Sequence, residues 1–123
     1  MNLNDTVWAK LAPSRIHGIG VVAIRDIPAG QKIYCQSTRQ EARKDFSYDI
    51  LPEIRHLIIQ RWPRATEGGE FLSPNDDARL LSFMNHSGHP NYDPFSDTAL
   101  QDIKRGEEIT EDYMEYKNIC LNQ

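Results

Sequence analysis

The chain has 123 residues, of which 39% are hydrophobic and 26% charged, the composition of a globular protein. This length falls within the usual range of one domain, so we expect a single domain over residues 1–123. The formal net charge of −4 argues against nucleic-acid binding, and no apolar run approaches the roughly 20 residues that cross a bilayer. We expect a protein that is not in a membrane and that has a basic partner.

Neither the N-terminus nor the cysteines indicate export. The first ten residues carry Asp5 where a signal peptide would need basic residues, and they lack an apolar central region. Cys35 and Cys120 lie far apart in the sequence, and two separate thiols fit this context better than a disulfide. We therefore expect an intracellular protein.

The N-terminal third is predicted to be rich in β-strands. Short apolar stretches at 7–9, 21–24 and 32–36 alternate with glycine-containing turn signals at 17–20 and 28–30. This pattern is typical of small sheets joined by tight turns.

One helix is predicted, between Asp49 and Trp62. Apolar residues recur there at helical spacing, Asp49 is a candidate N-cap, and Pro63 stands just beyond the end. The apolar stretch at 78–84 fits a helix or a strand equally well.

The C-terminal region predicts two more short strands, at 100–103 and 108–113, around a turn at 104–106. Its carboxylates are concentrated, and two interpretations remain open: a solvated acidic edge or an electrostatic trap for a cationic peptide. The acidic residues concerned are Glu107, Glu108, Glu111, Asp112 and Glu115.

Three segments concentrate residues that can carry chemistry, and each is weak evidence alone. Gly18-Ile19-Gly20 is most often a hairpin turn, because glycine adopts positive φ at no steric cost. Asn85-His86 is most simply a hydrogen-bonded loop pair, since a buried polar group without a partner costs roughly 1 to 3 kcal/mol. The third segment, 102–113, is a turn into a strand that ends on Tyr113. His86 and His89 have no carboxylates or thiols beside them in a ligand pattern, so we expect no metal site.

Together and in this order, the three segments resemble the SET-domain family of protein-lysine methyltransferases over nearly the whole chain. The resemblance implies a mainly β fold with one or two short helices, in which small sheets form a β-clip. The Asn-His segment and the C-terminal segment are expected to thread together as a pseudoknot. The matching motifs are Gly18 to Gly20 with Ile27-Pro28-Ala29-Gly30, Asn85-His86-Ser87 with Pro90-Asn91, and Gly106 to Thr110 leading to Asp112-Tyr113.

The resemblance also implies S-adenosylmethionine as cofactor and a role for each matched residue. The backbone of Gly18-Ile19-Gly20 would approach the methionine part of the cofactor closely, because the two glycines lack side chains. Asn85 would hold that part through its amide, and His86 would contact the adenine. Tyr113 is the expected catalytic residue, with its hydroxyl where the amine and the methyl meet.

A substrate lysine has an ordinary pKa of about 10.4 and must lose its proton before it attacks the methyl group. A narrow apolar channel and a nearby sulfonium both disfavour the ammonium form, so no dedicated base is required. Aromatic side chains are expected to line this channel, and the candidates are Tyr113, Tyr116, Phe46 and Tyr48.

Three positions depart from the family pattern. Glu111 stands two residues before the catalytic tyrosine, where the family usually has Phe or Tyr; on a strand it would share a face with Tyr113 and enter the channel. An ionised Glu111 would stabilise the ammonium and slow attack, which leaves the number of methyl groups added open. Ser82 and Gly88 replace an Arg and a Cys without removing a group that the chemistry needs. The family's cysteine-rich zinc-binding flank is absent.

We expect a protein-lysine methyltransferase that acts on a basic peptide or tail, such as a histone or histone-like protein. The alternative is a catalytically silent SET-like module that binds a partner protein. Asn85, His86 and Tyr113 favour the enzyme, and Glu111 favours the silent module. The short chain resembles viral and bacterial members of the family and makes a homodimer plausible.

Overall fold

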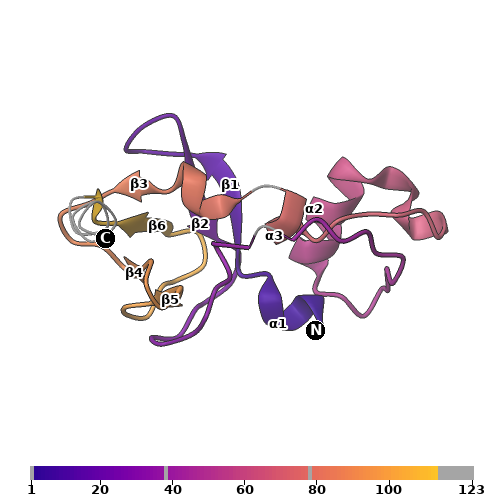
Figure 1. The fold of residues 1–123 in the computed structure, drawn as a ribbon, viewed down its shortest axis with the longest axis horizontal. Coiled ribbons are helices and arrows are strands. Elements are labelled where there is room, and N and C mark those ends of the chain that lie inside the picture. The colour runs from indigo at the N-terminus through magenta and orange to yellow at the C-terminus, as the bar shows by residue number, and fades with distance from the viewer. Residues whose placement is uncertain (1, 38, 78, 114–123) are drawn as a thin grey trace.

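The structure is a computed structural model that describes residues 2–37, 39–77 and 79–113 (Figure 1). Its helices are short and its strands form two small sheets. The helices are α1 (Leu3–Thr6), α2 (Pro52–Arg61), α3 (Pro74–Asp77) and the 3₁₀ turns η1 (Pro63–Glu67) and η2 (Leu80–Phe83). The strands are β1 (Ala9–Pro13), β2 (Ile19–Ala23), β3 (Asn85–His86), β4 (Tyr92–Asp93), β5 (Thr98–Ala99) and β6 (Glu108–Glu111).

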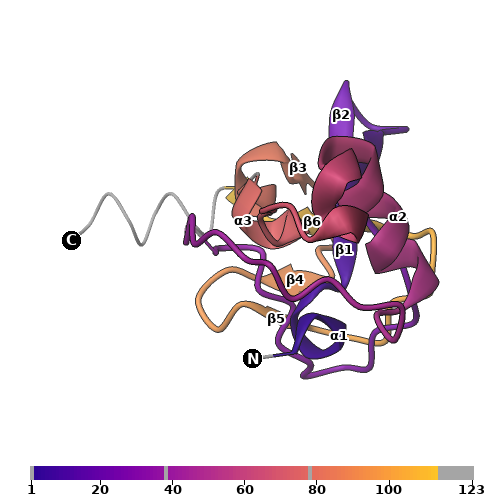
Figure 2. The same ribbon diagram turned by 90° about the vertical axis from the view of Figure 1, so that its right-hand side faces the viewer.

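The larger sheet brings together segments that lie far apart in the sequence. Its strand order is β1-β2-β6-β3, with β6 antiparallel to β2 and parallel to β3. The apolar side chains of Val21 and Ile109 stand opposite each other in register and are fully buried, which fixes the pairing of β2 with β6. In both views the β4-β5 pair lies below β3 and β6 (Figures 1 and 2).

The segment that follows β3 wraps around β6. Ser87 N–H donates to the Glu111 carbonyl at 3.0 Å, which continues the β3–β6 pairing. Further along, the Asn91 side chain donates to the Glu108 carbonyl at 2.9 Å and accepts from Thr110 N–H at 2.9 Å. The Asn91 amide thus bonds to backbone groups of β6 that a neighbouring strand would otherwise pair with. These bonds hold the C-terminal segment in the pseudoknot that the family resemblance implies.

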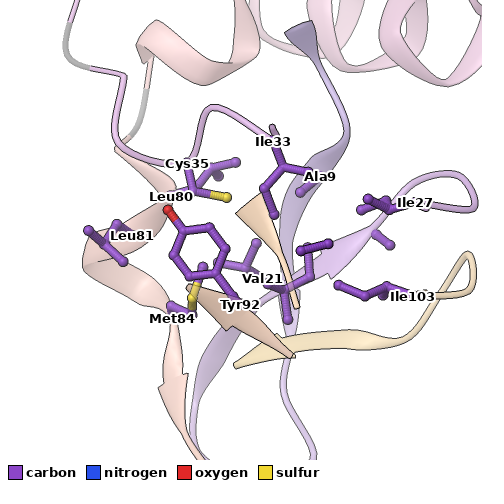
Figure 3. Packing of buried hydrophobic residues seen from close by; sticks show 13 residues of the cluster. Ala9, Val21, Ile27, Ile33, Cys35, Leu80, Leu81, Met84, Tyr92 and Ile103 are labelled. Carbon is purple, nitrogen blue, oxygen red and sulfur yellow. The ribbon is translucent and has the colours of Figure 1, made fainter. Parts of the chain in front are cut away.

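Two hydrophobic clusters form the core. The first lies under the sheets, where Figure 3 shows the Tyr92 ring among aliphatic side chains. The second packs α1 and α2 against the end of the sheet, at the opposite end of the molecule from β3 and β6 (Figure 1). The first contains Ala9, Val21, Ala23, Ile27, Ile33, Cys35, Leu80, Leu81, Met84, Tyr92, Ala99, Ile103 and Ile109. The second contains Leu3, Val7, Ile24, Ile50, Ile54, Ile58, Ala65 and Phe71.

The predicted helix exists but begins later than expected. α2 starts at Pro52, after Leu51 as an N-cap that makes no side-chain hydrogen bond. Proline suits the first helical position, because its fixed φ fits the helix and its missing N–H has no partner there. Asp49 lies in the preceding turn, where its carbonyl accepts from the Asn4 side chain at 3.3 Å, so its prediction as N-cap is wrong. The helix ends at Arg61, before Pro63, as expected.

Several predicted strands are shorter than expected. Within 32–36, only Lys32 makes a bridge, and the Cys35 N–H donates at 3.0 Å to the side chain of Asp97 instead of to a strand. Ile103 makes a single bridge to Ile27, so no strand forms at 100–103. At Cys35 a side-chain acceptor from a distant part of the chain takes the place of a strand partner.

Two other stretches take helical forms. The undecided stretch at 78–84 contains η2, and the segment before β1 forms α1, which the sequence did not predict. Within the three described ranges, no helix has both the length and the apolar character needed to cross a membrane.

Candidate active site

Tyr113 stands two residues beyond the end of β6 and is fixed by groups of the β3 region. Its hydroxyl donates to the Met84 carbonyl at 2.5 Å, and its backbone N–H donates to His86 Nδ1 at 3.1 Å. The rings of His86 and Tyr113 lie 5.3 Å apart at an angle of 47°. The two residues that the sequence assigns to catalysis and adenine binding are therefore in direct contact.

The Tyr113 hydroxyl is held in its neutral form. Burial raises the pKa of this phenol, and the charge of Glu111 raises it further. Because the hydroxyl proton is given to the Met84 carbonyl, the oxygen can act toward a further donor only as an acceptor.

The His86 ring accepts through Nδ1, which requires this nitrogen to be unprotonated. The Asp112 carboxylate also approaches Nδ1, at 3.9 Å, a distance that would matter only for a protonated ring. The hydrogen bond from the Tyr113 backbone is the shorter of the two contacts and orients the ring.

Glu111 is buried beside this site. Its side chain is 6% exposed, and its Oε2 has no hydrogen-bond partner among the described residues. Burial raises the pKa of the Glu111 carboxyl, because a charge in an apolar setting is unfavourable. β6 ends at Glu111, so the predicted strand at 108–113 is two residues too long, although Glu111 and Tyr113 remain close enough for the charge of one to act on the other.

Cys35 shares this region. The thiol is free and fully buried, and its pKa is raised by burial and then by the charges of Asp97 and Glu111. Met84, whose carbonyl holds Tyr113, belongs to the same hydrophobic cluster as Cys35. The Cys35 thiol therefore lies among hydrophobic side chains, close enough to Asp97 and Glu111 for their charges to act on it.

Asn85 anchors the loop that carries the Gly-x-Gly motif. Its Nδ2 is the donor in every hydrogen bond that its side chain makes to described residues, and no described donor bonds to its Oδ1. The amide is 8% exposed, so these contacts are largely shielded from water. The acceptors are Ser14 Oγ at 3.0 Å, the His17 carbonyl at 3.0 Å, the Ile19 carbonyl at 3.4 Å and Glu108 Oε2 at 3.0 Å.

The two glycines of the loop serve different purposes. Gly18 has a φ of +51°, a conformation that L side chains rarely adopt, and a Cβ there would meet nothing within 4 Å. Gly20 has no such φ, but a Cβ there would lie 2.6 Å from Glu108 Oε2 and 3.1 Å from Asn85 Nδ2. Glycine is needed at position 18 because of the backbone conformation, and at position 20 because neighbouring side chains leave no room for a Cβ.

The acidic run does not behave as one surface. Glu107 is exposed, but Glu108 is half-buried in contact with Ser14 and Asn85, and Glu111 is buried. A uniform solvated edge is therefore wrong for the described part of this run, and Glu115 lies outside the described residues. Sequence reasoning missed Glu108 because no motif separates it from Glu107; only the register that pairs Glu108 with Val22 does so.

Two of the four channel candidates are placed elsewhere. Phe46 packs against the second hydrophobic cluster, with its ring 6.4 Å from that of Phe71. Tyr48 is 69% exposed and makes an edge contact with Phe46 at 5.4 Å. Both therefore lie beside the second cluster and α2, apart from the contacts that hold Tyr113, and their role as channel residues stays a prediction; Tyr116 lies outside the described residues.

The loop and Asn85 together offer acceptors that could hold a ligand with an amino-acid portion. The Asn85 amide, through its Oδ1, and the carbonyls of His17 and Ile19 are acceptors, which suit an ammonium group. Ile16 and Ile19 expose 53% and 55% of their surface beside these acceptors and suit an apolar chain. Within the described ranges, no three His, Cys, Asp or Glu side chains are placed to hold a metal ion.

One comparison with known proteins identifies the family of this chain. The family model described as SET domain matches residues 18–114, and the chain belongs to the SET-domain family, whose members are generally methyltransferases that use S-adenosylmethionine.

Solved structures include a Plasmodium falciparum protein provisionally described as a histone methyltransferase. It is 16% identical, with a TM-score of 0.44 over 88% of this chain and 94% of that chain. At this TM-score the likeness adds nothing to the family assignment. No curated protein sequence matches the chain significantly.

Proposed function

We propose that this chain is an S-adenosylmethionine-dependent protein-lysine N-methyltransferase that acts on a basic peptide or tail, such as a histone or histone-like protein. The observation that supports this most strongly is the double role of β3. Asn85 bonds to the Gly-x-Gly loop, and its neighbour His86 bonds to Tyr113. A two-residue strand thus couples the proposed cofactor loop to the proposed catalytic hydroxyl.

Methyl transfer is a displacement at carbon, and an enzyme contributes chiefly by aligning the amine with the methyl group and the leaving sulfur. The cofactor, when bound, supplies the methyl group on a positively charged sulfur. The loop carbonyls and Asn85 would hold its amino-acid portion, and His86 would lie against its adenine. The chain has to provide rigid positions rather than a strong acid or base.

Tyr113 would align the substrate amine. Its hydroxyl proton is donated to the Met84 carbonyl, so toward a substrate amine the oxygen would act as an acceptor. An amine N–H that bonds to this oxygen would have its own lone pair directed elsewhere, toward the methyl group. The raised pKa of Tyr113 keeps the phenol neutral, so this residue would not remove the proton of the lysine ammonium.

Glu111 bears on both the enzyme and the silent module. An ionised carboxylate beside Tyr113 would hold the substrate as an ammonium ion, which cannot attack. The raised pKa of Glu111 favours its neutral form and weakens this objection. Glu111 nevertheless supports the second candidate, a silent SET-like module. It stands where a family member usually has an aromatic ring, and its Oε2 has no hydrogen-bond partner among the described residues.

Calorimetry with S-adenosylmethionine tests the proposal on the intact chain. Binding with micromolar or tighter affinity would support the methyltransferase. An absence of binding at millimolar cofactor would sink it for this chain and leave the silent module.

A further inference from the structure

The carboxylate of Glu108 lies beneath the Gly-x-Gly loop and is not explained by the proposed chemistry. Both of its oxygens accept from the Ser14 hydroxyl, at 2.8 and 2.9 Å, and Oε2 also accepts from Asn85 Nδ2 at 3.0 Å. Charged acceptors form stronger hydrogen bonds than neutral ones. Glu108 therefore joins β6 to the β1–β2 loop and to β3 at one point.

Ser14 passes this interaction on to the backbone of the loop. Its Oγ accepts from the N–H groups of Ile16 at 2.8 Å and His17 at 3.2 Å. A hydroxyl that accepts from two backbone groups must direct its own proton to another acceptor, and Glu108 is that acceptor. The path of residues 14–17 thus depends on a side chain 94 residues away.

Gly20 completes the arrangement because it leaves room for the carboxylate. A Cβ at this position would stand 2.6 Å from Glu108 Oε2, a separation that real Cβ atoms essentially never show. The second glycine of the motif is therefore matched to Glu108 in this chain, besides any closeness to a ligand.

We propose that Glu108 is a positioning residue of the cofactor site, which fixes the Asn85 amide and the loop at 14–19 so that their oxygens face the ligand, and that Gly20 is required to accommodate its carboxylate. This inference rests on the proposed function for the identity of the ligand. The contacts among Glu108, Ser14, Asn85 and Gly20 can be tested without it.

The substitution Glu108→Gln removes the charge and one acceptor oxygen of the side chain and keeps its shape. Glutamine keeps the volume and one acceptor oxygen, but its NH₂ group would face the Ser14 hydroxyl or the Asn85 amide, both of which are donors here. With its oxygen in the place of Oε2, glutamine can still accept from both donors, but the negative charge is lost and the NH₂ group lies against the Ser14 oxygen, which already accepts from Ile16 and His17. Glu107→Gln is the matched control, because it removes a carboxylate from the adjacent, exposed position.

The first experiment measures S-adenosylmethionine binding by calorimetry and the dependence of the methylation rate on cofactor concentration. Glu108→Gln should weaken binding about tenfold and raise KM for the cofactor by a similar factor, with a much smaller change in kcat. Glu107→Gln should bind as the wild type does. Equal affinities for wild type and Glu108→Gln would overturn the proposal.

The second experiment needs no cofactor. Gly20→Ala is made in the wild type and in a Glu108→Ala background, and the urea midpoint of unfolding is measured for all four proteins. The loss of midpoint caused by Gly20→Ala should be clearly smaller when the carboxylate is absent. An equal loss in both backgrounds would overturn the match between Gly20 and Glu108. If the wild type binds no cofactor, the proposed function fails, and this second experiment still decides the inference.

Discussion

Two regions that flank β3 differ in how completely their polar groups are satisfied. On one side, Ser14, Asn85 and Glu108 form a network in which the Asn85 amide donates to several acceptors and the Glu108 carboxylate accepts from two side chains. On the other side, Glu111 is buried beside Tyr113, and its Oε2 has no partner within residues 2–37, 39–77 and 79–113. Satisfied buried networks rigidify a structure, whereas an unpaired buried group calls for a functional explanation. The contrast agrees with the proposal that the Asn85 side is a preformed cofactor site and that the Tyr113 side is a substrate site completed by a ligand.

The largest effect is expected at the substrate side, from Tyr113→Phe. The phenylalanine ring can keep its contact with His86, but the oxygen that would align the amine is lost. The rate of methyl transfer should fall about 10²-fold, while cofactor affinity changes little, because a small loss of alignment is enough to cost this much. Rates and cofactor affinity measured on the same preparation check the split. A parallel loss of both would mean that Tyr113 supports the cofactor side instead.

A strong effect is also expected at the cofactor side, from Asn85→Asp. The change replaces the donor Nδ2 with an oxygen that faces Glu108 Oε2, the Ser14 oxygen and two carbonyls. The free energy of unfolding should fall by about 1 to 3 kcal/mol, and cofactor binding should be lost more completely than in Glu108→Gln. Urea unfolding and calorimetry measure the two effects. A stable, fully binding variant would show that the network is not the rigid side.

A smaller effect, of defined sign, is expected from pH. The folded-state pKa of Glu111 is raised above that of the unfolded chain, so its protonated form stabilises the fold. This contribution is complete below the unfolded value of about 4.3 and is lost as pH rises through the folded pKa. Glu111→Gln, which mimics the neutral form, should match the wild type in acid and exceed its urea midpoint at higher pH. Midpoint curves that stay parallel across pH would contradict a buried, neutral Glu111.

The smallest effect is expected far from both regions, from Tyr48→Ala. This exposed ring at the α2 end touches Phe46 and a neighbouring arginine, Arg55, but lies in the second cluster's part of the molecule. Its removal should change the free energy of unfolding by no more than about 0.5 kcal/mol and leave methyl transfer close to the wild-type rate. A large loss of activity would return Tyr48 to the substrate channel and place the α2 end in the site.

The sequence predicted what depends on local pattern. The spacing of Ile54 and Ile58 predicts α2, and the ordered motifs place Asn85, His86 and Tyr113 in one site, because each motif carries its own residue types. The start of α2 was misplaced because Pro52 and the turn before it override the capping preference of Asp49.

Other features depend on contacts between distant segments. The role of Glu108 depends on the register between β2 and β6, which pairs it with Val22. The periodicity of the sequence does not contain this register. The placement of Phe46 against the second cluster was not predictable for a similar reason: aromatic composition cannot tell which of two clusters a ring joins. The incomplete strand at 32–36 follows from the Asp97 side chain, 62 residues away, which takes the Cys35 N–H.

The most direct test of the central claim is radiolabelled methyl transfer from S-adenosylmethionine onto histones and total lysate protein, followed by identification of the labelled residue. The account predicts label on lysine side chains of basic proteins and its loss in Tyr113→Phe. A wild-type chain that binds the cofactor but labels no protein would contradict the methyltransferase and leave a silent SET-domain module.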